Sequence, residues 1–113
     1  MENCLFCKII AGEIPSTRVY EDDQVYAFRD INPQMPTHVL VIPKKHVSSL
    51  SEADQLSDQE LSACLRAIRL IAAQEHLDSG YRVVSNCGDD ACQSVHHLHF
   101  HLLGGSKMAE RMS

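Results

Sequence analysis

The 113-residue sequence has no tryptophan, no cluster of basic residues and no apolar run of the length that crosses a membrane. Its 10 lysines and arginines are scattered among 15 acidic residues, and the formal net charge is −5. Because phosphate backbones are held by clustered cations, we do not expect a long DNA or RNA as the main ligand. A single nucleotide is not excluded, since backbone N–H groups and a few side chains can hold one phosphate.

The sequence also lacks the features of an exported protein. Its first residues, MENCLFCKII, place an acid near the start and a lysine inside the apolar run, unlike a signal peptide. The five cysteines are an odd number, which argues against a disulfide framework. We therefore expect a cytoplasmic protein. Its length is that of one domain, residues 1–113, whose modest core favours stabilisation by dimerisation.

Apolar periodicity and capping residues predict two helices. A short helix over residues 4–11 ends at Gly12, and a long helix begins at Ser57, which forms a capping box with Glu60. Gly80 marks the end of the long helix. The apolar face of the long helix is expected to comprise Leu61, Cys64, Leu65, Ile68 and Ala72.

Apolar runs and alternating segments predict the strands. These cover residues 18–21, 24–29, 38–43, 81–86 and 95–103, and turns or polar loops separate most of them. Short connections and one long helix predict an α+β fold, in which an antiparallel sheet of about five strands is packed by one long and one short helix.

The segment QSVHHLHFHLLGG, residues 93–105, holds four of the seven histidines. Side chains of a strand alternate between its faces, so His97, His99 and His101 are expected on one face. The apolar side chains at positions 98, 100 and 102 then face a helix or a partner subunit. His96 interrupts this apolar face and is expected near the edge of the strand.

Three imidazoles on one face have three interpretations. They can bind one metal ion, since three histidines plus water form a catalytic zinc pattern. Alternatively, one ring is a nucleophile toward phosphorus, while its neighbours hold its tautomer and share protons. The third interpretation is structural, but each neutral ring would then need both a donor and an acceptor as partners.

The segment HLHFHLL, residues 97–103, resembles the histidine triad pattern of His-apolar-His-apolar-His-apolar-apolar. Three other segments, CLFCKIIAGEIPS, EDDQVYAFRDINPQMPTHVLVIPKKH and GYRVVSN, extend the likeness together with QSVHHLHFHLLGG. Together they resemble the nucleoside phosphoramidase branch of the histidine triad nucleotide-binding proteins, from about residue 5 to residue 105.

This resemblance implies a homodimer of α+β subunits that binds a purine nucleoside monophosphate. It also implies hydrolysis of a P–N bond at the α-phosphorus, in substrates such as an adenosine phosphoramidate or AMP linked to a lysine amine. Three alternatives stay open: a dinucleoside polyphosphate hydrolase, a nucleotide-binding or scaffold module with incidental turnover, and a zinc-dependent hydrolase.

The resemblance also implies roles for single residues. His99 matches the nucleophile, and His97 and His101 match its flanking members. His38 matches a supporting histidine, and Ser94 a hydroxyl that assists the leaving amine. The implied nucleotide contacts include His99 and His101. Asp30 is implied to contact the ribose hydroxyls, and Asn86, Gln93 and Ser94 are implied near the phosphate. The implied apolar wall around the base consists of Leu5, Phe6, Ile9, Phe28 and Ile31. A carboxylate suits a ribose diol because it offers two acceptor oxygens, although an aspartate at this place could instead cap the following loop.

Cys4 and Cys7 form a C-x-x-C pair, which is too few ligands for a zinc site by itself. Members of the wider superfamily complete such a pair with two histidines, and the resemblance points to His46 and His97 as the matching residues. A structural zinc would make His97 an orienting ligand, while the chemistry itself needs no cofactor. The alternative is that both cysteines are small buried residues.

Three features depart from the pattern that the chain resembles. Cys92 stands where glycine is common, and His96 stands where an aromatic residue is common. The tail SKMAERMS is short and polar and lacks an aromatic residue. Because the tail tunes leaving-group preference in relatives, the preferred amine stays open.

Overall fold

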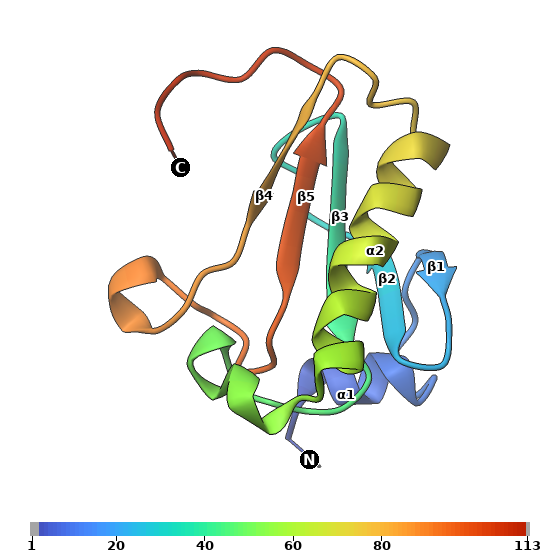
Figure 1. The fold of residues 1–113 in the computed structure, drawn as a ribbon, viewed down its shortest axis with the longest axis vertical. Helices are drawn as coiled ribbons and strands as arrows, with labels where there is room; N and C mark the ends of the chain where they lie inside the picture. The colour runs from blue at the N-terminus through green and yellow to red at the C-terminus, as the bar shows by residue number, and fades with distance from the viewer. Residues whose placement is uncertain (1–2, 113) are drawn as a thin grey trace.

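The computed structural model describes residues 3–112, which form an α+β fold around one antiparallel sheet (Figure 1). The sheet has five strands in the order β1-β2-β3-β5-β4, and every neighbouring pair is antiparallel. The predicted fold class is confirmed. The elements are α1 (Leu5–Ile10), β1 (Arg18–Glu21), β2 (Val25–Arg29), β3 (Thr37–Pro43), the 3-10 helix η1 (Leu50–Gln55), α2 (Asp58–Gln74), β4 (Tyr81–Val84), the 3-10 helix η2 (Asp89–Ala91) and β5 (Phe100–Gly104).

Helix α2 packs on one face of the sheet. Its capping box is confirmed, since the Ser57 hydroxyl accepts the N–H of Glu60 over 3.0 Å and the Glu60 carboxylate accepts the N–H of Ser57 over 2.8 Å. Two expectations for this helix were wrong. Leu65 is 55% exposed, and the buried face instead consists of Cys64, Ala67, Ile68, Ile71 and Ala72. The helix ends at Gln74, before Gly80, because His76 takes a left-handed φ of 58° that breaks the helical path.

Helix α1 packs on the other face through Phe6 and Ile9. The two faces follow from the alternation of side chains along β2 and β3. Val25, Ala27, Val39 and Val41 join the α2 core, whereas Tyr26, Phe28, Leu40 and Ile42 join the cluster under α1. The central strands β2 and β3 are therefore buried on both sides.

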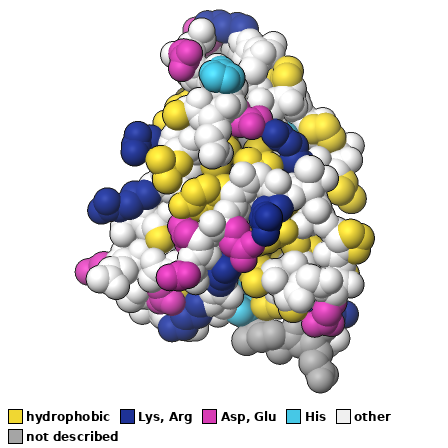
Figure 2. All heavy atoms as spheres, turned by 90° about the vertical axis from the view of Figure 1, so that its right-hand side faces the viewer, with side chains coloured by type: hydrophobic (Ala, Val, Ile, Leu, Met, Phe, Trp, Pro, Cys, Tyr) yellow, Lys and Arg dark blue, Asp and Glu magenta, His cyan; other side chains and the backbone are white. Residues whose placement is uncertain are grey.

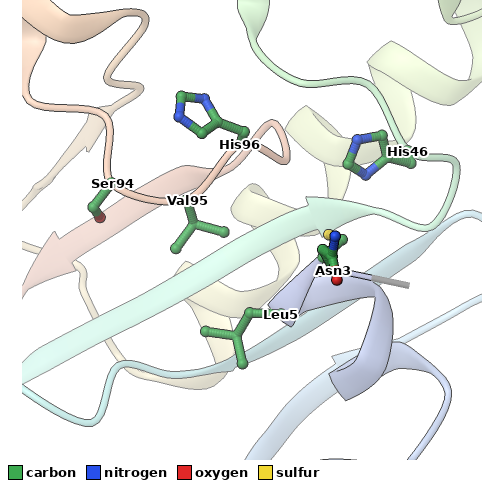
Figure 3. Close-up of a pocket in the computed structure, with 7 residues that line it drawn as sticks. Asn3, Leu5, His46, Ser94, Val95 and His96 are labelled. Atoms are coloured by element: carbon green, nitrogen blue, oxygen red, sulfur yellow. The ribbon is translucent and has the colours of Figure 1, made fainter. Parts of the chain in front are cut away.

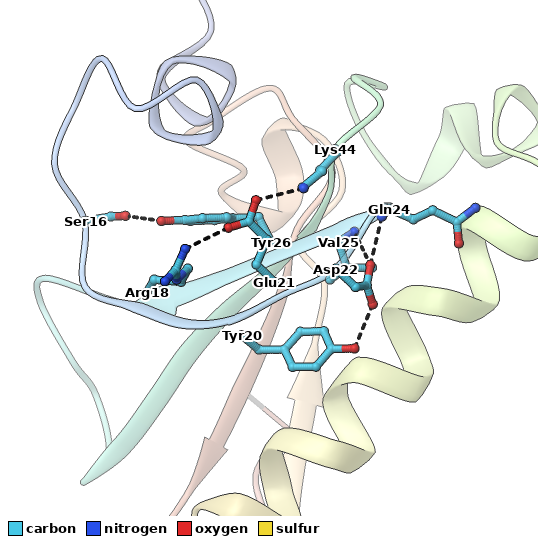
Figure 4. Close-up of polar contacts among 9 residues, drawn as sticks. All are labelled: Ser16, Arg18, Tyr20, Glu21, Asp22, Gln24, Val25, Tyr26 and Lys44. Carbon is cyan, nitrogen blue, oxygen red and sulfur yellow. Dashed lines mark hydrogen bonds and ion pairs between the residues drawn. The ribbon is translucent and has the colours of Figure 1, made fainter.

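A polar network holds the turn between β1 and β2 (Figure 4). One oxygen of Asp22 accepts the N–H groups of Gln24 and Val25, each over 2.8 Å, and the other accepts the hydroxyl of Tyr20 over 2.7 Å. Asp22 thus forms an aspartate turn, in which the side chain holds the backbone two and three residues further on. It fixes the start of β2, whose last residue precedes Asp30.

The final strand is shorter than predicted, because residues 95–99 are not in the sheet. In the register of β3 with β5, Val41 lies opposite Phe100, so continued pairing would bring the chain to Pro43, which has no N–H to donate. Leu98 instead donates its N–H to the carbonyl of Val47 over 2.8 Å. Strand β4 likewise stops at Val84, and the Ser85 hydroxyl bonds the carbonyl of His99 over 2.9 Å.

Charges of both signs are interspersed with apolar side chains on the face seen in Figure 2, and no continuous basic field covers it. Within residues 3–112, no helix is long and apolar enough to cross a membrane.

Candidate active site and metal cluster

The three histidines of the triad lie on the α1 side of the sheet, although two of them precede β5. The ring of Phe6 lies edge-on to His97 and His99, with centroid distances of 6.0 and 5.2 Å. His101 follows in the strand itself, with its ring centroid 5.2 Å from that of His99. Leu98, Phe100 and Leu102 belong to the opposite core under α2, and His96 is exposed. The predicted alternation of faces is therefore present even where the strand is not.

His99 is held in one tautomer by the backbone. Its Nδ1–H donates to the carbonyl oxygen of His97 over 2.7 Å, and a carbonyl can only accept. The neutral ring therefore keeps its lone pair on Nε2, which has no hydrogen-bond partner within residues 3–112. Burial lowers the pKa of His99. This hydrogen bond and the Asp30 charge raise that pKa, but by less. An imidazole that is neutral, with a free and fixed lone pair, is a competent nucleophile.

His38 and His101 form a hydrogen-bonded chain beside His99. The backbone N–H of Gln34 donates to Nδ1 of His38 over 3.0 Å, so the His38 proton is on Nε2. That Nε2–H donates to Nδ1 of His101 over 2.9 Å, and the His101 proton is therefore on Nε2. Burial, with the neighbouring His99 and His38, lowers the pKa of His101 to about 4. The chain thus supplies a neutral N–H donor from His101 for an oxyanion.

Asp30 follows the last residue of β2 and takes the capping role that was considered for it. One carboxylate oxygen accepts the N–H of Asn32 over 2.8 Å and so caps the loop. The other oxygen lies 3.4 Å from Nε2 of His38. The carboxylate is therefore fixed beside the histidine chain with part of its acceptor capacity unused.

The structure brings together three of the five residues predicted for the base wall. Phe6, Ile9 and Phe28 are buried in one apolar cluster, and the rings of Phe6 and Phe28 meet edge-on with a centroid distance of 5.4 Å. Leu5 is 43% exposed at the start of α1. Ile31 is fully exposed on the loop after Asp30, so it forms no part of a wall in this conformation.

The loop before the triad uses two predicted phosphate contacts for its own support. The buried amide of Gln93 donates to the carbonyls of Ser48 and Val95, over 2.7 and 3.1 Å, and accepts the N–H of Gly88 over 2.9 Å. The Asn86 amide donates to the carbonyl of Ala91 over 2.9 Å. Ser94 is exposed, with no such bond to another described residue. Cys92 has a left-handed φ of 61°, a conformation that glycine adopts with less strain.

An open depression of about 800 Å³ lies beside the triad (Figure 3). Ser94, Val95 and His96 line it from the loop before β5, and Leu5 lies at the start of α1. The depression contains Ser94 and Leu5 of the predicted site, whereas Asp30, His99 and His101 are not part of its wall. Cys4 and His46 also line this depression.

The four zinc ligands that the resemblance implied converge in one cluster: Cys4, Cys7, His46 and His97. Nδ1 of His97 lies 3.3 Å from Sγ of Cys4, 3.6 Å from Sγ of Cys7 and 3.1 Å from Nδ1 of His46. In a tetrahedron, bonds of about 2.3 Å to sulfur and about 2.0–2.1 Å to nitrogen place two nitrogens about 3.3 Å apart and a nitrogen and a sulfur about 3.6 Å apart, so the three distances agree to within about 0.3 Å. The donor set and its spacing therefore fit a four-coordinate zinc ion.

The orientation of His97 also suits a metal ligand. Its Nε2–H donates to the carbonyl of Pro43 over 2.8 Å, which leaves the lone pair of Nδ1 directed into the cluster. Such a bond behind a ligating histidine is the usual support of a metal site. Without a metal ion, burial, with the neighbouring Cys4, raises the pKa of Cys7 to about 11. A bound cation would instead lower the pKa of the Cys7 thiol, because it favours the thiolate.

Asp30, His38 and His101 form a second group whose ligand atoms converge. The 2.9 Å contact between the two rings is a complete hydrogen bond, so these residues are satisfied without an ion.

Comparison with known proteins supplies the family. The model of the HIT domain, named after the histidine triad, matches residues 11–108. The chain belongs to the histidine triad (HIT) family. The 14 kDa zinc-binding protein of Zea mays is 53% identical over 106 residues, which cover 92% of this chain and 83% of that protein. Adenylylsulfatase HINT1 of Arabidopsis thaliana is 50% identical over 106 residues, which cover 92% of this chain and 72% of that protein.

A solved HIT family hydrolase from Clostridium thermocellum has the same fold as this chain. Its TM-score is 0.95 at 46% sequence identity, and the match covers 100% of this chain and 99% of that one. The family predicted from the triad and its neighbouring motifs is therefore confirmed.

Backbone groups that the sequence does not reveal orient this HIT site. The N–H of Gln34 and the carbonyls of Pro43 and His97 fix the ring tautomers. No side chain marks these positions, because any residue offers a carbonyl and almost any offers an N–H.

We expect the tautomers of four buried histidines to be visible by long-range ¹H–¹⁵N NMR at neutral pH. The pKa of each of these rings, at positions 38, 97, 99 and 101, is lowered mainly by burial, so all four should be neutral. His99 should carry its proton on Nδ1, and the other three on Nε2. The exposed His76, which has no ring hydrogen bond within residues 3–112, should give an averaged spectrum. A proton on Nε2 of His99 would contradict the assigned orientation.

Proposed function

We propose that this HIT protein is a purine nucleoside phosphoramidase, which hydrolyses the P–N bond between a nucleoside monophosphate and an amine. The observation that carries the proposal is the free Nε2 of His99, whose ring is fixed by the carbonyl of His97. The family match and a structural neighbour named as a hydrolase support hydrolysis as the reaction class.

In the first step, the Nε2 lone pair of His99 attacks the α-phosphorus and the P–N bond breaks. The leaving nitrogen takes a proton and departs as a neutral amine. We assign to the exposed hydroxyl of Ser94 the role of passing that proton on from solvent. The product on the enzyme is a nucleotidyl-histidine with a positively charged ring. The carbonyl of His97 stabilises that charge through the Nδ1–H.

In the second step, water attacks the phosphorus from the side that the amine has left. The bond from phosphorus to Nε2 breaks, its electron pair returns to His99, and the water loses a proton as the monophosphate forms. Throughout both steps the Nε2–H of His101, oriented by His38, donates to a phosphoryl oxygen.

The bound nucleotide is assigned by the chemistry of its parts. Asp30 keeps acceptor capacity for the ribose hydroxyls, and the buried Phe6 and Phe28 give a flat apolar base something to pack against. Gln93 and Asn86 act on the phosphate through the loop whose shape they maintain.

A second candidate has a different leaving group. The relative from Arabidopsis thaliana is named an adenylylsulfatase, so a sulfate leaving group on the same adenylyl unit is a specific competitor. A dinucleoside polyphosphate hydrolase is the third. All three use one nucleotidyl-histidine and differ only in the group that departs in the first step.

We also propose a structural zinc ion at the Cys4–Cys7–His46–His97 cluster. The tetrahedral spacing of the donor atoms supports it, and so does the relative from Zea mays that is named a zinc-binding protein. Bound there, zinc would tie the start of α1 to the segment that precedes β5. The catalytic steps use His99, His101 and Ser94 and need no metal.

His99→Ala should abolish turnover. Because the variant loses the only attacking atom, we expect kcat/KM for an adenosine phosphoramidate to fall by at least about 1000-fold. The matched control is His76→Asn, since this exposed histidine lies outside the site and asparagine tolerates its left-handed φ. Acid-quenched native enzyme should carry a nucleotidyl adduct that the His99→Ala variant lacks.

Native enzyme that is inactive, or a variant that keeps its rate, would withdraw the enzymatic proposal. The same assay with adenylyl sulfate and a diadenosine polyphosphate ranks the leaving groups. The phosphoramidase proposal stands only if the P–N substrate has the highest kcat/KM.

The native protein should bind a single zinc ion per chain. Cobalt substitution should give the intense absorption of a thiolate-to-cobalt transition. Cys7→Ser should weaken metal binding by at least about 100-fold, which is more than the usual effect of losing a residue that only supports a ligand. The matched control is Cys87→Ser, because Cys87 lies outside the cluster and contacts Ser51, with 3.1 Å between their sulfur and oxygen atoms. Equal metal affinity in the two variants would contradict the assigned ligands.

We further propose a homodimer formed through α2 and the open edge of β4. Leu65 and Leu70 of α2 and Tyr81 and Val83 of β4 are exposed by 38–55%, and an unpaired strand edge favours a second copy. Sedimentation equilibrium should give twice the 12.6 kDa of one chain. Leu65→Glu should give a monomer, whereas Leu50→Glu, at a leucine of η1 that is 44% exposed, should not.

A further inference from the structure

We infer that Cys4 and Cys7, through the metal ion they hold, are positioning residues for the nucleotide pocket. Metal binding at the cluster and nucleotide binding at the triad then strengthen each other. This inference rests on the proposed function, because it needs both the zinc ion and the bound nucleotide.

The first connection is helix α1. Cys4 is its N-cap and Cys7 lies in its first turn, with the Cys7 N–H donating to Sγ of Cys4 over 3.2 Å. Phe6 lies between them and places its ring against both Phe28 and His99, at centroid distances of 5.4 and 5.2 Å. The residue that forms the base wall is therefore flanked on the same helical turn by both sulfur ligands.

A helix of this length cannot hold its own position. Six residues are far too few for a stable isolated helix, so α1 depends on side-chain contacts. Phe6, in the first turn, and Ile9, near the end of the helix, anchor α1 in the apolar cluster, which Cys4 also contacts. Beside these apolar contacts, Cys4 and Cys7 tie the start of α1 to the two histidines of the metal cluster.

The second connection is His97. Its ring belongs to the cluster, while its own carbonyl oxygen accepts the Nδ1–H of the nucleophile His99. Ring and carbonyl belong to the same residue, so a metal ion that holds the ring also restricts the peptide unit that orients His99. One ion therefore acts on the base wall and on the nucleophile by separate routes.

Without the ion, the two sulfur ligands are held more weakly than the two histidines, whose ring nitrogens lie 3.1 Å apart. The sulfur–nitrogen contacts of 3.3–3.6 Å are weak thiol hydrogen bonds, and a neutral thiol has one proton for several acceptors. The start of α1 can then adopt other positions, and a nucleotide must restore the ordered one. A site that has already been ordered by one ligand binds the second more tightly.

The coupling is reciprocal, because both ligands favour the same ordered state. Zinc should tighten AMP binding, and AMP should tighten zinc binding by the same factor. We expect at least about fivefold in each direction, the lower end of the usual range for coupled sites.

The experiment measures both directions on the full chain. Calorimetry gives the dissociation constant of AMP for zinc-loaded protein, for chelator-stripped protein, and for Cys7→Ser beside its control Cys87→Ser. Metal affinity is measured by competition with a chromogenic chelator, with and without saturating AMP. Stripping and Cys7→Ser should weaken AMP binding at least about fivefold. Cys87→Ser should leave it unchanged, and AMP should lower the zinc dissociation constant.

Phe6→Leu separates coupling from general loss of structure. Leucine keeps an apolar side chain in the cluster, so this variant should fold and bind zinc, but it lacks the ring that contacts His99. Its AMP affinity should respond to zinc by a smaller factor than that of the native chain. If zinc changes the AMP affinity of Phe6→Leu by the same factor as that of the native chain, the connection through α1 is overturned. This conclusion holds even if the stripped protein unfolds.

The outcomes also separate this inference from the proposals beneath it. Zinc-loaded protein that binds no AMP refutes the nucleotide site, and protein that binds no zinc refutes the metal site. Protein that binds both, each with an affinity independent of the other, overturns the coupling alone.

Discussion

His97 is fully buried, and three hydrogen-bonding groups of this one residue join three parts of the molecule. Its Nε2–H reaches the carbonyl that ends β3, its Nδ1 meets the cysteines of α1, and its own carbonyl orients His99. A buried imidazole without partners would be costly, so these contacts must form together for the site to exist. The position of α1, the tautomer of the nucleophile and the metal cluster all depend on this residue.

The end of the sheet makes such an arrangement available. Pairing between β3 and β5 stops before Pro43, so residues 95–99 are free of the ladder, and their carbonyls can accept side-chain donors. The carbonyls of Pro43, Val95, His97 and His99 each accept a side-chain hydrogen bond. In a continuous strand those acceptors would be committed to neighbouring backbone. The site therefore lies where regular structure ends and the core still excludes water.

Local sequence pattern predicted the capping box at Ser57, the five strands and the alternation of the triad, which are all present. The convergence of Cys4 and Cys7 with His46 and His97 followed from the family resemblance and is present too. Local pattern failed where a distant residue decides the outcome. The late start of β5 depends on its register against Pro43, and the exposure of Leu65 depends on how α2 is rotated over the sheet. The amide of Gln93 is occupied by Ser48, a residue 45 positions away, and no local pattern encodes that contact.

The alternation of residues 97–102 divides this segment into two independent sets. Odd positions carry the histidines, whose ring nitrogens must keep individual partners. Even positions carry Leu98, Phe100 and Leu102, which only fill space under α2. Apolar cores tolerate exchange of residues with similar volume, whereas an oriented ring tolerates almost none. One side of the segment thus accepts exchange of residues and the other does not, although neighbouring residues share a peptide bond.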